Sequence, residues 1–220
     1  MIVVVDYGAG NVQSVVNALE KIGADALLTT DPETIRTAAG VIVPGVGAAK
    51  DTMENLERSG LIEPVMDVIA AGTPYLGICM GMQALMTYSV EHGGQRCLDI
   101  VPGVARELET DLAVPHMGWN AVEATQAGRG HPLLDGIPDG AEFYFVHSFA
   151  CFPDDRAWVL AETGYGSPFP SIIGGRNIMS TQFHPEKSGA YGLRLLKNFI
   201  AIAQAGGVEK MTERSTGVTA

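Results

Sequence analysis

The chain has 220 residues, and 46% of them are hydrophobic, which is enough for one globular unit with a substantial buried core. Its net charge of −11 leaves no basic stripe that could neutralise phosphates, so the composition argues against nucleic-acid binding and against an anionic membrane surface. The opening residues MIVVVDYG contain neither a basic leader nor a long apolar run, and we expect a cytoplasmic protein without a membrane span.

Cysteine usage indicates neither a disulfide framework nor a metal site. Cys79, Cys97 and Cys151 are odd in number, widely spaced and not arranged as a CxxC pair. We therefore expect no metal and no cofactor, and chemistry from at most one or two of these thiols.

The N-terminal half alternates strands and helices. Ile2–Val5 is a continuous β-branched run typical of a central parallel strand, and a turn over residues 6–10 follows it. Apolar residues then recur at helical spacing until Gly23, which ends the helix. Further strands are predicted at residues 26–29, 41–43 and 74–78, and helices at about 61–71 and directly after Cys79. This alternation predicts a parallel sheet with helices on both faces.

The rest of the sequence is richer in strands. Strand-like segments separated by Gly and Pro turns cover residues 119–123, 142–147, 158–162 and 171–173, and we expect an antiparallel extension of the sheet. A last strand at 177–183 and a helix at about 188–203 complete one domain over residues 1–203. Residues 204–220 are polar and lack apolar periodicity, so a flexible tail is expected there.

The segment GICMG at residues 77–81 lies between a predicted strand and a predicted helix, which is the arrangement of a nucleophile elbow. Its two glycines let neighbouring backbone pass without a Cβ clash. The positive end of the helix that begins at Met80 favours the reactive thiolate of Cys79, and its N–H groups can face an oxyanion. The alternative for Cys79 is a buried structural cysteine, which the strand–turn–helix context makes the minor interpretation. Cys97 and Cys151 lack such a context and are given no chemical role.

A cysteine that attacks an amide needs a base and a group that orients the base. In QFHPE at residues 182–186, His184 and Glu186 are two apart on an extended segment and point the same way. His184 alone could be an ordinary surface histidine, but together with the elbow it is the favoured base. The other histidines are His92, His116, His131 and His147, and spacing excludes neither His116 nor His147.

Backbone donors for an oxyanion are offered by PGVG at residues 44–47, a glycine-rich loop directly after a predicted strand. A plain strand-to-helix turn would have the same sequence character. The other glycine turn, at residues 8–10, lacks a full GxGxxG pattern and is not interpreted as a dinucleotide site.

Residues 77–83 together with residues 182–186 resemble the motifs of the class I (triad) glutamine amidotransferases. The chain is similar, from residue 1 to about 203, to one subfamily: the glutamine amidotransferase subunits of imidazole glycerol phosphate synthase in histidine biosynthesis. The segments that carry this similarity are DYGAGN at 6–11, PGVGA at 44–48, PHMGWN at 115–120, YFVHS at 144–148 and HPEKS at 184–188.

The resemblance implies a single-domain α/β fold with a flavodoxin-like parallel sheet, helices on both faces and an antiparallel β extension. It implies a catalytic triad of Cys79, His184 and Glu186. It also implies an oxyanion hole formed by the backbone of Val46, Gly47 and Met80, and glutamine binding by Gly47, Gln83, Ser148 and Phe149. Phe149 stands where the family commonly has tyrosine, and Ala49 lies in a loop where phenylalanine is frequent; neither position belongs to the triad.

The implied reaction is thiolate attack on the glutamine amide, loss of ammonia with a proton from His184, and hydrolysis of a glutamyl thioester. Ammonia would be protonated in bulk water. The family therefore implies a docked cyclase subunit that uses the ammonia on a phosphoribulosyl formimino nucleotide, giving imidazole glycerol phosphate and an aminoimidazole carboxamide ribotide. Trp119, Asn120 and Lys187 are candidates for the docking face, and ordinary rim residues are the alternative.

Two other functions remain open. A glutaminase subunit of another synthase, for example of the anthranilate synthase type, would share the triad, but the segments HMGWN and PGVGA argue against it. A non-catalytic scaffold that only binds a partner would be expected to have a broken triad, and here all three members are present.

Overall fold

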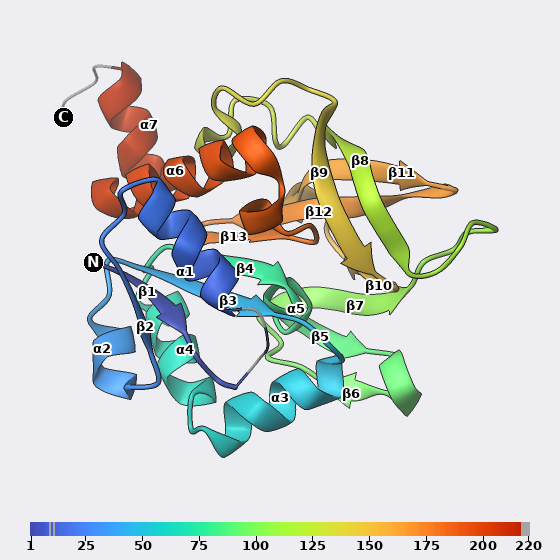
Figure 1. Ribbon diagram of the computed structural model, residues 1–220, viewed down its shortest axis with the longest axis horizontal. Coiled ribbons are helices and arrows are strands. Elements are labelled where there is room, and N and C mark those ends of the chain that lie inside the picture. Colours follow the sequence, from blue (N-terminus) through green and yellow to red (C-terminus); the bar gives the residue numbers. More distant parts are fainter. Residues whose placement is uncertain (9, 11, 217–220) are drawn as a thin grey trace.

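The computed structural model of the chain describes residues 1–8, 10 and 12–216. A nine-stranded sheet has the order β2-β1-β3-β4-β13-β12-β11-β8-β9, and a four-stranded sheet with the order β10-β7-β5-β6 accompanies it (Figure 1). Within the described residues, no helix is long and apolar enough to cross a bilayer.

The first five strands of the main sheet are parallel, and their spatial order relative to the chain, 2-1-3-4-5, is that of flavodoxin-like folds. They are β1 (Ile2–Val5), β2 (Ala26–Thr29), β3 (Gly40–Gly45), β4 (Tyr75–Cys79) and β13 (Ile178–Thr181). β1 and β2 begin and end at the predicted residues, and the bounds of the other three differ from the prediction by one or two residues. The predicted parallel sheet is confirmed.

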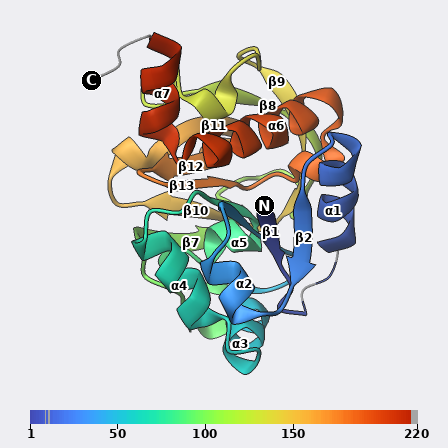
Figure 2. The same ribbon diagram turned by 90° about the vertical axis from the view of Figure 1, so that its left-hand side faces the viewer.

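Helices cover both faces of the parallel strands, as predicted. α1 (Val12–Lys21) and α6 (Gly189–Ala205) lie on one face, and α2 (Pro32–Arg36), α3 (Ala49–Arg58) and α4 (Ile62–Ala70) on the other (Figures 1 and 2). Successive side chains of β1 point to opposite faces of the sheet, and both sets are apolar, so each face needs a covering layer of helices. Ile2 and Val4 belong to the core cluster that includes α1 and α6, whereas Val3 and Val5 belong to the cluster that includes α3 and α4.

The main sheet continues beyond β13 with antiparallel strands, which confirms the predicted extension. These are β12 (Ser167–Gly175), β11 (Val159–Tyr165), β8 (His116–Ala124) and β9 (Ala141–His147). In the β8–β9 register His116 lies opposite His147, and Trp119 lies opposite Tyr144. The extension therefore brings two of the segments that carried the family resemblance side by side.

The second sheet was not predicted. It consists of β5 (Met86–Ser89), β6 (Gln95–Arg96), β7 (Val101–Glu107) and β10 (Phe149–Pro153). β7 and β10 lie in the strand-rich part of the sequence, but they pair with each other, and β7 also pairs with β5. Side chains such as Met86, Val101 and Cys151 join the core cluster of α3 and α4. Short 3-10 helices lie at Glu91–Gly93, Pro132–Leu134, Arg156–Trp158 and Pro185–Lys187.

Helices account for the other differences from the sequence predictions. α2 and α3 were not predicted, and α5 (Met80–Gln83) is a single turn before the chain enters β5. Where a tail was expected, Val208–Thr216 forms α7, because Val208 and Met211 pack partly buried against the core. Residues 217–220 of that expected tail, and Ala9 and Asn11 of the first glycine turn, lie outside the described residues.

The approach of β3 to the turn after β4 leaves no room for a side chain at Gly81, where a Cβ would collide with the Val43 carbonyl. We expect Gly81→Ala to lower the free energy of unfolding by about 3 kcal/mol, because β3 or the turn must move. The control is Gly164→Ala, where the added Cβ meets nothing within 4 Å. Its free energy of unfolding is expected to change by less than about 0.5 kcal/mol. Urea denaturation measures both, and equal losses would contradict this packing.

Candidate active site

The three predicted catalytic side chains lie beyond the carboxyl ends of two neighbouring parallel strands. β4 ends at Cys79, and β13 ends at Thr181, shortly before His184 and Glu186. The strands pair with Ile78 opposite Thr181, so both chain segments leave the sheet at the same edge. In open α/β sheets this edge is where ligands bind.

Cys79 occupies a strained turn. Its φ of 53° and ψ of −102° lie in a sparsely populated region, which costs on the order of 1–3 kcal/mol. A Cβ at Gly77 would come within 2.5 Å of the Gly81 carbonyl oxygen, so both glycines are needed. The buried Tyr75 hydroxyl donates a hydrogen bond to the same oxygen at 2.9 Å. The turn has the geometry of the predicted nucleophile elbow.

The glycine-rich loop at the end of β3 lies against this elbow. Gly45 is opposite Cys79 in the register of β3 and β4, and a Cβ there would collide with the Tyr7 hydroxyl and with Met80. The Tyr7 hydroxyl donates to the Pro44 carbonyl at 2.8 Å. Burial raises the pKa of Tyr7 far above its usual range, so its hydroxyl keeps its proton. Tyr7 thereby fixes the loop whose N–H groups were predicted to face the oxyanion.

Glu186 orients His184. Nδ1–H of His184 donates to Oε1 of Glu186 at 2.8 Å, and the two side chains are only 2% and 1% exposed. Because Nδ1 makes this bond, Nε2 is the ring nitrogen left to exchange a proton with Cys79. Burial lowers the pKa of His184, but interactions with Cys79 and Glu186 outweigh it and raise the pKa to about 9. The imidazole is therefore protonated at neutral pH.

One backbone hydrogen bond and two bonds of the Ser188 hydroxyl hold the segment that carries His184 against β9. The N–H of His184 donates to the Tyr144 carbonyl at 3.0 Å. The Ser188 hydroxyl donates to the His184 carbonyl at 2.6 Å and accepts the N–H of Tyr144 at 2.9 Å. The position of the imidazole is thus set by the sheet as well as by Glu186.

A fourth side chain contacts the thiol. Nε2 of the fully buried Gln182 donates to Sγ of Cys79 at 3.7 Å. The sequence interpretation had assigned support of the thiolate to the helix that begins at Met80. That helix, α5, has only 4 residues, so few aligned peptide dipoles contribute. Beside this short helix, the Gln182 amide and the imidazole of His184 also lie against the sulfur.

A cavity of about 500 Å³ opens in front of Cys79. The residues predicted for the oxyanion hole and for glutamine binding all line it: Val46, Gly47, Met80, Gln83, Ser148 and Phe149. Nε2 of Gln83 donates to the Phe149 carbonyl at 3.2 Å. Glu91, which no motif indicated, also lines the cavity, and its carboxylate accepts the N–H of Ala49 at 2.7 Å, at the start of α3. The cavity therefore offers an acidic group and several amide groups within one enclosure.

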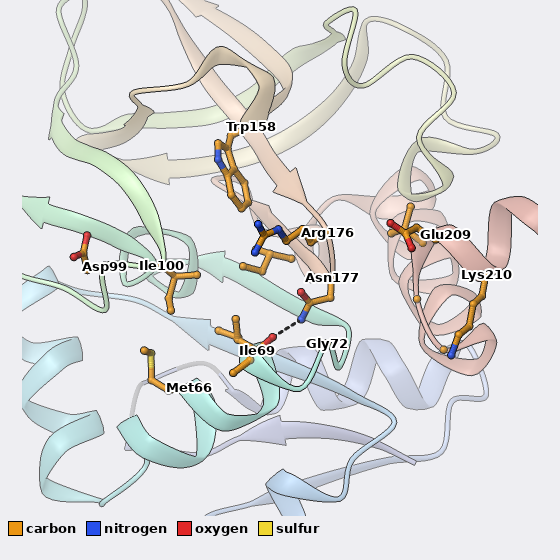
Figure 3. A pocket seen from close by; sticks show the side chains of 15 residues that line it. Met66, Ile69, Gly72, Asp99, Ile100, Trp158, Arg176, Asn177, Glu209 and Lys210 are labelled. Atoms are coloured by element: carbon orange, nitrogen blue, oxygen red, sulfur yellow. Dashed lines mark hydrogen bonds between the residues drawn. The ribbon is translucent and has the colours of Figure 1, made fainter.

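A larger cavity, of about 710 Å³, contains none of the triad residues. Residues from α4 and the turn after it surround this cavity, together with Asp99 and Ile100 before β7 and Trp158 before β11 (Figure 3). The turn before β13 and the start of α7 complete its wall. Among the residues of this wall, Asn177 donates to the Ile69 carbonyl (Figure 3). Asn177 also donates to the Thr73 carbonyl, and the two bonds hold the turn before β13 on α4. Size alone does not identify the reactive site. The reactive site is identified by the strained Cys79 beside the buried His184–Glu186 pair.

The other histidines are engaged elsewhere. The His92 side chain is 72% exposed, and Nδ1 of His131 accepts the N–H of Leu133. His116 and His147, which spacing could not exclude as the base, are hydrogen-bonded to each other at 3.0 Å. Their ring nitrogens are committed to partners other than the thiol, so His184 is the base that the geometry supports.

Cys97 and Cys151 have the surroundings of structural cysteines, and both are free. Burial raises the pKa of Cys97 to about 11 and that of the fully buried Cys151 well above its usual value. Both therefore remain protonated thiols at neutral pH. Among the described residues, no group of His, Cys, Asp and Glu could hold a metal ion.

Four side chains of the site were given no role by the sequence: Tyr7, Tyr75, Glu91 and Gln182. Tyr7 and Gln182 lie inside segments that carried the family resemblance, so their position close to the reactive residues was a usable signal. Tyr75 and Glu91 act through contacts between segments that the fold brings together, and no spacing rule indicates those contacts.

Comparisons with known proteins show the family of the chain. The family described as glutamine amidotransferase class-I matches residues 3–203. The chain is 50% identical over 206 residues to the imidazole glycerol phosphate synthase subunit HisH of Chloroflexus aurantiacus, covering 93% of this chain and 97% of that protein. The subunit of the same name from Herpetosiphon aurantiacus is 49% identical, with coverage of 94% and 97%. That of Geobacter sulfurreducens is 46% identical, with coverage of 90% and 97%.

Solved structures share the fold at low sequence identity. A crystal structure of a glutamine amidotransferase superimposes with a TM-score of 0.73 at 19% identity, covering 93% of this chain and 100% of that one. The glutaminase domain of Trypanosoma brucei CTPS, solved with bound acivicin, gives a TM-score of 0.66 at 16% identity, with coverage of 92% and 93%.

The protonation of His184 can be measured by NMR titration of its ring nitrogens. We expect a midpoint near pH 9, and a midpoint lower by about one unit in Glu186→Gln, which removes an interaction that raises the pKa. Because the unfolded value is about 6.5, this charge stabilises the fold fully below that pH and ceases to do so as the pH rises through 9.

The control for that titration is Glu162→Gln, which removes a carboxylate that pairs with Arg156. It should leave the midpoint of His184 unchanged. A midpoint near 6.5 in the unmodified chain would contradict the coupling of His184 to Cys79 and Glu186.

Proposed function

This chain belongs to the class I glutamine amidotransferase family, and we propose that it is the glutaminase subunit of an imidazole glycerol phosphate synthase. The observation that carries the proposal is the strained Cys79 beside the buried His184–Glu186 pair, facing a cavity lined by amide groups. The PHMGWN and HPEKS segments, together with the relatives that bear this subunit's name over nearly their full length, support the choice of synthase.

The geometry accounts for each step of glutamine hydrolysis. The Cys79 thiolate adds to the side-chain carbonyl carbon, and the C=O electrons move to oxygen, where backbone N–H groups of Gly47 and Met80 stabilise the charge. His184 gives its Nε2 proton to the amide nitrogen, the C–N bond breaks, and ammonia leaves. Water then adds to the glutamyl thioester while His184 takes a proton from it, and glutamate and the thiolate are released. Glu186 keeps the imidazole oriented throughout.

We assign glutamine recognition to the walls of the 500 Å³ cavity. Gln83 and the backbone of Gly47, Ser148 and Phe149 supply hydrogen-bonding groups at its surface. The Glu91 carboxylate, which the sequence motifs did not indicate, adds a negative charge complementary to the α-ammonium group of glutamine. A site that hydrogen-bonds both ends of an amino acid rejects analogues lacking those groups, because its own buried polar atoms would remain unpaired.

The product ammonia calls for a partner. Ammonia released into water at neutral pH is mostly ammonium, which is not a nucleophile, so a cyclase subunit must receive it directly. Met117 and Trp119 of β8 are 63% and 54% exposed, and Lys187 lies over the Tyr144 ring at 6.0 Å. We infer that Trp119 and Lys187 belong to the docking face. The Asn120 side chain instead makes hydrogen bonds to His116 and to the Gly164 carbonyl.

We infer a cytoplasmic location, and no role for nucleic acid or membrane, from the acidic composition and from the phosphorylated nucleotide on which the cyclase acts.

The second candidate function is that of a glutaminase subunit of another synthase, since the triad chemistry is common to the two kinds of glutaminase.

Glutamate release from glutamine separates these functions. It would be measured with the chain alone, with the cyclase subunit, and with the cyclase subunit plus its nucleotide substrate. We expect strong stimulation by the partner and its nucleotide. Release that ignores this partner would favour another synthase, and no release under any condition would favour a non-catalytic scaffold.

We expect Cys79→Ser to abolish glutamine-dependent synthesis by the complex and to leave the partner's reaction with added ammonium salts intact, because only the first requires the thiolate. Loss of both activities would contradict the division of labour between the subunits.

Cys97→Ser and Cys151→Ser serve as matched thiol controls. Their thiols stay protonated at neutral pH, so turnover within about twofold of the unmodified complex is expected. A large loss of turnover in either variant, with the fold intact by circular dichroism, would mean that the wrong thiol has been assigned.

A further inference from the structure

Two buried histidines beside the glutamine cavity take no part in the reaction described above. His116 on β8 and His147 on β9 lie directly opposite each other and are 3% and 6% exposed. His147 lines the cavity, while His116 stacks between the rings of Phe145 and Tyr165 at 4.8 and 4.0 Å. Burying two imidazoles is costly unless their nitrogens are hydrogen-bonded, so their partners matter.

Both rings are neutral. Burial lowers the pKa of His116 to about 4. Burial also lowers the pKa of His147, to about 3; the hydrogen bond to the Phe149 carbonyl opposes this shift, and the positive charge of His184 acts in the same direction as burial. A neutral imidazole has one N–H donor and one acceptor nitrogen, so the partners of each ring decide which nitrogen carries the proton.

The hydrogen bonds run in one direction. Nδ1 of His147 lies 2.8 Å from the Phe149 carbonyl, which can only accept, so Nδ1 carries the proton. Nε2 of His147 must then accept from Nδ1–H of His116, at 3.0 Å. Nε2 of His116 in turn accepts from the side-chain amide of Asn120 at 3.3 Å. Both rings are therefore Nδ1–H tautomers.

Asn120 fixes the start of this chain of bonds. Its Nδ2 also donates to the Gly164 carbonyl at 2.9 Å, and its Oδ1 accepts the N–H of Ala121 at 2.9 Å. The amide cannot turn over without breaking both bonds. Asn120 lies next to the exposed Trp119 on β8, on the strand assigned above to the docking face.

The other end of the chain lies in the cavity wall. The Phe149 carbonyl accepts from His147 and from Nε2 of Gln83, at 3.2 Å. With Nε2 engaged, the buried Oε1 of Gln83 has no hydrogen-bond partner among the described residues, and it is the amide atom left to accept a bond from a ligand. An unpaired buried acceptor of this kind is costly until a donor reaches it.

We propose that Asn120, His116 and His147 form a hydrogen-bond relay that positions the Phe149 carbonyl and, through it, the Gln83 amide as an acceptor for substrate glutamine. The three are positioning residues, since they act through Phe149 and Gln83. The inference rests on the proposed function for the identity of the ligand. It joins the docking strand to the substrate cavity through bonds of fixed direction.

The relay can be tested by kinetics in the assembled complex with the cyclase subunit. His116→Phe keeps the stacking between Phe145 and Tyr165 but removes both hydrogen bonds, and we expect KM for glutamine to rise about tenfold with kcat within about threefold. His116→Asn places an amide N–H near the position of Nδ1. Its KM for glutamine should therefore lie much closer to that of the unmodified complex than the KM of His116→Phe does. The matched control is Tyr165→Phe, which removes the hydrogen bond to the Ala113 carbonyl and keeps the ring; its KM should be unchanged.

The tautomers give a readout that does not depend on turnover. Nitrogen-15 NMR of the full chain should show protonated Nδ1 and unprotonated Nε2 for both His116 and His147. An Nε2–H tautomer in either ring, or an unchanged KM in His116→Phe, would overturn the relay. A complex that never hydrolyses glutamine would instead refute the proposed function, and the tautomer signals would still decide the relay.

Discussion

The backbone of Cys79 is the constraint on which the site depends. The residue is held at a positive φ between β4 and a single helical turn; a side chain at Gly77 would collide with the backbone of that turn, and one at Gly81 would prevent the close approach of β3 to it. Such strain persists only where the surroundings over-determine it. Here two buried tyrosine hydroxyls hold the turn and the neighbouring glycine-rich loop, and buried strands pack on both sides. The reactive sulfur therefore projects at the carboxyl edge of a rigid sheet.

Burial alone does not set the charge of a histidine in this protein. His184 and His147 are both almost completely buried, yet the pKa is raised in the first and lowered in the second. The difference lies in their partners. His184 faces the Glu186 carboxylate and the Cys79 sulfur, whose negative charges stabilise the imidazolium, whereas His147 faces a carbonyl and another neutral ring. One protein thus keeps a proton donor and a neutral hydrogen-bond relay close together.

Local patterns predicted the parts of the fold that depend on local rules. The β-branched run of β1, the apolar run of β2 and the glycines around Cys79 each have a direct geometric meaning, and the structure has them as predicted. His184 and Glu186 do meet, but Glu186 lies in the 3-10 helix Pro185–Lys187 and not on the extended segment that the two-residue spacing assumed. The separate β5–β6–β7–β10 sheet could not be predicted, because pairing β7 with β10 joins strands more than 40 residues apart. The length of α5 and the contact of Gln182 with Cys79 likewise depend on tertiary packing that no periodicity records.

The central claim is that Cys79 is the nucleophile toward glutamine, and covalent capture tests it most directly. A glutamine analogue with an electrophilic carbon in place of the side-chain amide would be incubated with the complex, and the modified peptide identified by mass spectrometry. The account predicts one adduct per chain, on the peptide that contains Cys79, with formation slowed by excess glutamine. Adducts on Cys97 or Cys151, or labelling that glutamine does not slow, would contradict it.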